Sequence, residues 1–176
     1  YLLNCQLKAN GKLLVEGRKG VIIGGKTCAK LGVSCNGIGN IAEIATVVSV
    51  GIDKEDMTAY QELQKKIEQT QAELQTWENG LNKLMANPVH DEKVSMMIQR
   101  LTRAVYTLKS SRKELFSERN AQMEQMTKQK EARIQVSGRA YPGTLLFLNE
   151  DPFAIKEIYN NVEFVKHDNR IDTLAH

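Results

Sequence analysis

The side chains that most often carry catalysis or bind metals are few in this sequence and lie far apart. It has three histidines, and no two of them have the spacing of zinc ligands: His90, His167 and His176. Before residue 53 the only carboxylates are Glu16 and Glu43, whereas glycoside-cleaving enzymes need paired acids on one face. We therefore expect no catalytic residues, no cofactor and no metal site, and we predict that the chain is not an enzyme.

The cysteines and the glycine-rich segment do not form a reactive motif either. Cys5, Cys28 and Cys35 form no CxxC pair, and an odd number of thiols suits a reducing compartment better than a secreted disulfide scaffold. The segment from Gly20 to Lys26 is rich in glycine but lacks the GxxxxGK[ST] spacing of a phosphate-binding loop. The sequence thus predicts buried structural thiols and a cytoplasmic location.

Bulk composition excludes some classes of partner. The net charge of +3 is too small to indicate a nucleic-acid partner, because phosphate binding needs a concentrated positive field. No apolar run approaches the ~20 residues that a membrane-spanning helix needs, so we expect no membrane insertion. The chain begins at Tyr1 in what reads as the middle of a strand, and we expect it to be a fragment.

The elements that must position any site begin with residues 1–52, which carry most of the glycines among short β-prone runs. Every sixth residue from residue 23 is small or aliphatic; these residues are Ile23, Ala29, Cys35, Ile41 and Val47. This spacing predicts a β-solenoid whose coils pass these positions in the interior. A small sandwich with glycine-rich turns is the alternative.

Residues 53–133 show a different periodicity. Apolar residues follow alternating steps of three and four from Tyr60 to Leu84, and after Asn87 and Pro88 the same rhythm resumes at Val94. Since only a few residues separate the two segments, the second helix must return along the first. The sequence therefore predicts an antiparallel coiled-coil hairpin, with the region of Trp77 beside that of Leu101.

Charge is distributed unequally between the two predicted helices. The first has more acids than bases, and the second has a basic run that no acid interrupts, from Lys93 to Lys113. Glutamates such as Glu78 lie across the seam from this run, so we expect ion pairs within the hairpin. A nucleic-acid-binding face on the second helix is the alternative.

Residues 134–176 return to strands and turns, as in Ile134 to Val136 and the turn Tyr141-Pro142-Gly143. Both flanks share this texture, and antiparallel helices bring Asp53 and Arg133 together. We therefore interpret the hairpin, 53–133, as an insertion into one β-structure formed by 1–52 and 134–176. The predicted fold class is α+β, a β-solenoid interrupted by a long helical hairpin.

Several of these segments in this order resemble the flagellar assembly protein A (FapA) family. They are Gly20-Val21-Ile22-Ile23-Gly24-Gly25, the strand that ends in Gly51-Ile52-Asp53, the hairpin, and the stretch from Arg133 to Gly143. The resemblance spans nearly the whole chain and implies a right-handed β-solenoid in a bacterial protein linked to flagellar assembly or placement. It implies no catalytic residues.

These expectations predict a non-enzymatic scaffold that binds proteins through the hairpin or a flank of the solenoid. We predict that the contact residues are those exposed on the helices and at their turn, which are His90, Met96, Met97, Met123 and Met126. Homo-oligomerisation remains open. The enzymatic alternative is a solenoid acyltransferase of the left-handed, six-residue type, which needs a histidine on its coils, and residues 1–52 contain none.

Overall fold

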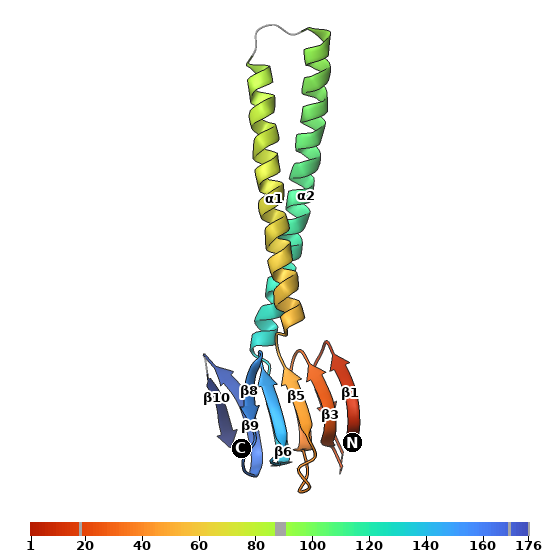
Figure 1. The fold of residues 1–176 in the computed structure, drawn as a ribbon, viewed down its shortest axis with the longest axis vertical. Helices are drawn as coiled ribbons and strands as arrows, with labels where there is room; N and C mark the ends of the chain where they lie inside the picture. The colour runs from red at the N-terminus through yellow and green to blue at the C-terminus, as the bar shows by residue number, and fades with distance from the viewer. Residues whose placement is uncertain (18, 87–90, 169, 176) are drawn as a thin grey trace. The chain divides into compact units, whose positions relative to one another are not determined.

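A computed structural model of the chain describes residues 1–17, 19–86, 91–168 and 170–175 (Figure 1). Before the helices come β1 (Leu2–Ala9), β2 (Leu13–Val15), β3 (Val21–Ala29), β4 (Val33–Ile38) and β5 (Thr46–Val50). The helices are α1 (Lys54–Met85) and α2 (Glu92–Lys130). After them come β6 (Ile134–Ala140), β7 (Thr144–Leu148), β8 (Asp151–Ala154), β9 (Tyr159–His167) and β10 (Arg170–Ala175).

The chain divides into two compact units. The first, here called the β unit, is Tyr1–Met57 together with Glu124–His176, and it contains the strands and one end of each helix. The second, the helical unit, is Thr58–Met123. Each is described by itself below.

The β unit is a stack of parallel strands in two columns. One column is β1, β3, β5 and β7, and the other is β2, β4 and β6. Leu2 pairs with Ile22 and Leu13 pairs with Val33, so one turn of the chain takes about 20 residues. The chain therefore passes from one column to the other and back once per turn, which is the topology of a solenoid.

The helices enter this stack at a corner between the two columns. At the same corner of the earlier turns, residues 10–12 join β1 to β2 and residues 30–32 join β3 to β4. In the third turn the corresponding connection, from Val50 to Ile134, contains α1 and α2. The pairing of Val33 with Ile134 nevertheless continues the column that Leu13 and Val33 begin. The insertion thus leaves the register of the stack intact.

The parallel stack ends with β7, the first strand of a fourth turn, and antiparallel strands follow it. β8 folds back on β7, while β9 lies antiparallel to β6 and is followed by β10. Phe153, Tyr159 and Phe164 form an aromatic cluster there, with ring centroids 5.5 to 6.4 Å apart. Since β8 and β9 pair with β7 and β6 in place of another parallel turn, the last parallel strands are not left as open edges.

The six-residue spacing predicted for the interior of the β unit does not match its buried residues. Ile41 is 82% exposed, and Ile23 and Val47 are only half-buried, whereas Ile22 and Val48 beside them are fully buried. Strands alternate their side chains with a period of two, and a turn of about 20 residues is not a multiple of six. The predicted interior positions were therefore partly wrong, although Ala29 and Cys35 are buried.

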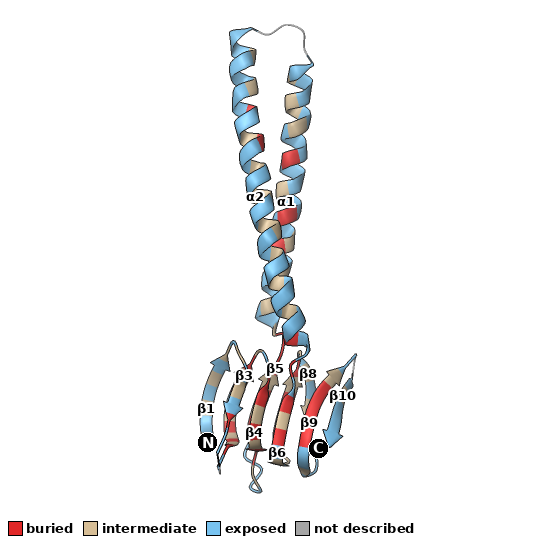
Figure 2. Cartoon of the chain, turned by 180° about the vertical axis from the view of Figure 1, so that it is seen from behind, coloured by how far each residue is buried: buried red, intermediate tan, exposed pale blue. Residues whose placement is uncertain are grey.

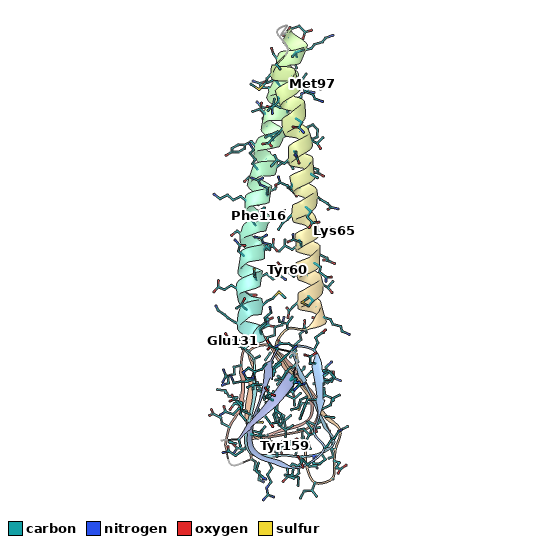
Figure 3. All side chains as sticks on the ribbon, turned by 90° about the vertical axis from the view of Figure 1, so that its left-hand side faces the viewer. Tyr60, Lys65, Met97, Phe116, Glu131 and Tyr159 are labelled. Carbon is teal, nitrogen blue, oxygen red and sulfur yellow. The ribbon has the colours of Figure 1, made fainter. Side chains whose placement is uncertain are left out.

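In the helical unit α1 and α2 lie side by side (Figures 1 and 3). The side chains buried in the described part of this unit come from the predicted apolar seam, and they are Leu63, Ile67, Leu74, Leu101 and Val105. Lys109 forms an ion pair with Glu78 at 2.8 Å, as expected from the charges, and Arg112 donates to Gln71 Oε1 at 2.8 Å. Neither helix has an apolar stretch long enough to cross a membrane, within the described residues.

Candidate functional site

An apolar hollow of the helical unit lies near the start of α2. Its volume is about 550 Å³, and we call it the Trp77 groove. The residues that line it are Trp77, Lys93, Met96, Met97, Arg100, Leu101 and Ala104. The α2 members recur at steps of three, four and seven, which place them on one face of the helix, and α1 contributes Trp77.

Large apolar side chains in this groove remain open to solvent. Trp77, Met96 and Met97 are 43%, 52% and 54% exposed, while Leu101 beneath them is buried in the seam. Met97 is labelled in Figure 3 near the end of the helix pair where α2 begins. Exposed methionines and tryptophan that adjoin one another are typical of surfaces that bind proteins, because both side chains supply large contact area.

The polar part of this lining is entirely basic. Lys93 and Arg100 border the groove, and within residues 1–17, 19–86, 91–168 and 170–175 neither forms an ion pair. Two other members of the same basic run, Lys109 and Arg112, are instead occupied across the helices by Glu78 and Gln71. Lys93 and Arg100 thus place positive charge beside the exposed apolar residues.

A second hollow of the helical unit has the opposite character. Its volume is about 370 Å³, and its lining is polar, with three glutamates. The residues are Lys66, Gln69, Thr70, Glu73, Ser111, Glu114, Leu115 and Glu118. It offers no exposed large apolar side chain, so we do not regard it as an interaction site.

The structure brings together only part of the predicted contact set. Met96 and Met97 share the Trp77 groove, whereas Met123 is exposed elsewhere on α2, about 39 Å further along at 1.5 Å per residue. Met126 is half-buried in the part of α2 that belongs to the β unit. His90 lies outside the described residues. The methionines therefore do not form one continuous stripe.

Trp77, Lys93 and Arg100 were not predicted as contact residues. The heptad spacing placed Trp77 in the seam, and the two cations belong to the run for which ion pairs were expected. The available signal was spacing, since Lys93, Met97, Arg100 and Ala104 follow one another at steps of four, three and four. The predicted hairpin did place the region of Trp77 beside that of Leu101, but spacing alone did not show that the indole would stay exposed there.

The α1 end of the insertion is held within the β unit by charged side chains. Lys8 of β1 contacts Asp53 at 3.4 Å and Glu55 at 2.5 Å, and Lys30 pairs with Asp56. Asp53 caps the helix, because its Oδ1 accepts from the Asp56 amide at 2.9 Å. Burial opposes ionisation of Asp53, but this hydrogen bond and the two lysines outweigh it and lower the pKa of the carboxyl.

Asn149 joins the two ends of the insertion. Its Oδ1 accepts from the Ile52 amide at 2.9 Å, and its Nδ2 donates to the Lys130 carbonyl at 3.1 Å. Gly51 leaves room for this amide: a Cβ there would lie 2.0 Å from Asn149 Oδ1, and Gly51 has φ +88°. One side chain of the fourth turn thus fixes where α1 begins and where α2 ends.

The β unit contains the three cysteines, and none of them is in a disulfide. Burial raises the pKa of the Cys35 thiol to about 12, so it stays protonated near neutral pH. Cys5 and Cys28 are half-buried free thiols. His167 pairs with Asp172 at 3.3 Å. In the part of the chain that the structure describes, no group of three or more potential ligands is arranged to hold a metal ion.

One comparison with known proteins gives a match. The model of the Flagellar Assembly Protein A beta solenoid domain matches residues 1–171, nearly the whole chain. No curated protein and no solved structure gives a significant match.

Proposed function

Because the chain belongs to the FapA family, we propose that it acts in flagellar assembly or placement as a non-enzymatic scaffold that binds other proteins. The family implies the role related to flagellar assembly. The scaffold part of the proposal is our own, and it assigns protein binding to the helical unit, with the flank of the solenoid as a further surface. We propose that this takes place in the cytoplasm.

The Trp77 groove carries the proposal that the helical unit binds proteins. A helix pair needs only its buried seam for its own stability, yet here Trp77, Met96 and Met97 line one hollow and remain partly exposed. Burying such side chains against a partner gives about 25 cal/mol for each Å² of apolar surface. Their exposure therefore favours a surface kept available for association.

Two finer features of the architecture belong to the same proposal. We infer that α1 and α2 pack as an antiparallel coiled coil, which the pairing of Gln71 with Arg112 and of Glu78 with Lys109 supports. We also infer that the solenoid is right-handed, since connections between parallel strands of one sheet are right-handed in about 98% of cases.

The test is made in a flagellated bacterium that encodes the protein. The chromosomal gene is replaced by a variant in which residues 58–123 give way to a short glycine-serine loop, and flagella per cell and their positions are recorded by electron microscopy. We expect fewer or misplaced flagella, with normal levels of the variant protein.

A matched strain carries Tyr106→Gln, which removes an exposed aromatic residue of α2 that does not line the Trp77 groove. This strain should assemble flagella normally. Normal flagella in the strain that lacks residues 58–123 would show that the helical unit is not the binding element and would contradict the proposal.

A further inference from the structure

The Trp77 groove has a chemistry that selects among partners. Its floor and walls are apolar, and its polar border is formed by Lys93 and Arg100. These two cations stand seven residues apart on α2, about 10 Å along the helix axis. An occupant of matching charge would carry two acidic groups at the same separation.

The backbone around the groove decides the conformation of the occupant. Both walls are helices, whose interior amide and carbonyl groups are already paired within each helix. An extended peptide would find no backbone partners there, so its own amides would lose water without replacement. A helix satisfies its backbone internally and can lay an apolar stripe along the groove.

We propose, as a refinement that rests on the proposed function, that the Trp77 groove binds an amphipathic helix of a partner protein, about three turns long, with acidic residues seven positions apart beside its apolar stripe. Its apolar side chains pack on Trp77, Met96 and Met97. Its two carboxylates pair with Lys93 and Arg100. The bound helix would lie as a third helix against α1 and α2.

The chain provides its own probe, because Trp77 is its single tryptophan. The ligand is a synthetic helical peptide of 21 residues without aromatic residues, with leucine at steps of three and four and glutamate at two edge positions seven apart. A matched peptide has lysine at those two positions. Each peptide is titrated into the full chain while Trp77 emission is recorded.

We expect the acidic peptide to bind saturably, to move Trp77 emission to shorter wavelength, and to bind at least about tenfold more tightly than the basic peptide, a preference that added salt reduces. The double variant Lys93→Glu, Arg100→Glu should reverse the preference. Met97→Gln should weaken the binding of both peptides, and Tyr106→Gln should leave both affinities unchanged. Circular dichroism of each variant verifies that its helices are intact.

Several results would overturn the proposal. These are an absence of binding, equal affinity for both peptides, or a preference that survives the double charge reversal. Displacement of the peptide by vesicles of anionic lipid, with the same loss on charge reversal, would assign the groove to a membrane surface instead. A concentration-dependent dimer in sedimentation that Met97→Glu abolishes would assign it to a second copy of this chain.

The outcome is separable from that of the proposed function. If loss of residues 58–123 impairs flagella but the acidic peptide does not bind, the scaffold stands and this assignment of partner chemistry fails. If the peptide binds as expected but flagella are unaffected, the groove chemistry stands and the scaffold role fails.

Discussion

The β unit and the helical unit bury their apolar residues in different ways. In the β unit, side chains such as Ile22, Val48 and Leu146 are completely buried between the two columns of strands. In the helical unit burial is confined to the seam, and Trp77 and Tyr106 are 43% and 76% exposed. Figure 2 shows this contrast as closely spaced buried positions on the central strands and isolated buried positions along the helices.

This difference indicates a division of roles. An inner solenoid strand is covered by neighbouring strands at both edges and by the opposite column on one face, so its buried side chains are enclosed from several sides. A helix in a pair buries one stripe and exposes the rest of its circumference. The helical unit can therefore vary its outer residues for binding without disturbing its own packing, and substitutions in the two units should have unequal effects.

The largest expected effect comes from Leu146→Ala in the centre of the β unit. Leu146 is fully buried in β7, and the cavity left among neighbouring strands should lower the free energy of unfolding by about 4 kcal/mol. The free energy of unfolding is measured by hydrogen exchange in urea, followed on peptides from β5 and β7. Leu14→Ala, at an exposed position of β2, should change stability by less than about 0.5 kcal/mol. Equal losses from the two substitutions would contradict the burial contrast.

A smaller loss is expected from Leu74→Ala in the seam of the helical unit. Leu74 is 1% exposed, but two helices can close on a cavity more easily than a stack of strands, so we expect about 2.5 kcal/mol. Urea unfolding followed by Trp77 fluorescence reports on this unit alone. The exposed neighbour in Gln75→Ala serves as control and should be nearly neutral. A cost as large as that of Leu146→Ala would show that both cores are equally rigid.

Next is Gly51→Ala, at the point where the strands give way to α1. The added methyl group would meet Asn149 Oδ1, and alanine is strained at φ +88°, so we expect a loss of about 2 kcal/mol in thermal unfolding. Gly11→Ala, with open space around the new methyl group, is the matched control and should not destabilise. Asn149→Ala in the Gly51→Ala background should recover part of the loss, and strictly additive effects would exclude the clash.

The smallest effect concerns the charge of Asp53. Asparagine also caps helices, so Asp53→Asn removes the charge and keeps the cap, and near neutral pH it should cost at most about 1 kcal/mol. Because the pKa of Asp53 is lowered from 3.8 in the folded chain, its stabilisation is fully present above pH 3.8 and is lost as the pH falls through the folded-state pKa. Melting temperatures of the chain and the variant should thus converge as the pH falls below 3.8. A constant difference would assign the effect to something other than this charge.

The candidate site was predictable only in part. Met96 and Met97 could be identified as exposed because they fall outside the heptad positions on α2. Trp77 falls on a heptad position, yet it lies 43% exposed at the groove. A large indole at the edge of a two-helix seam extends past its partner, and its neighbours on the other helix depend on the rotation of both helices, which spacing along one helix does not define.

Local patterns by themselves indicated two helices and glycine-punctuated strands on both sides of them. The apolar steps of three and four predicted both helices, and glycine-punctuated strands on both sides predicted an insertion, because these signals arise from side chains close in sequence. The length of a solenoid turn was decided by tertiary structure, since it depends on backbone pairing such as Val33 with Ile134, residues far apart in the chain. The Trp77 groove was likewise decided in three dimensions, because its two walls meet only when α1 and α2 pack together.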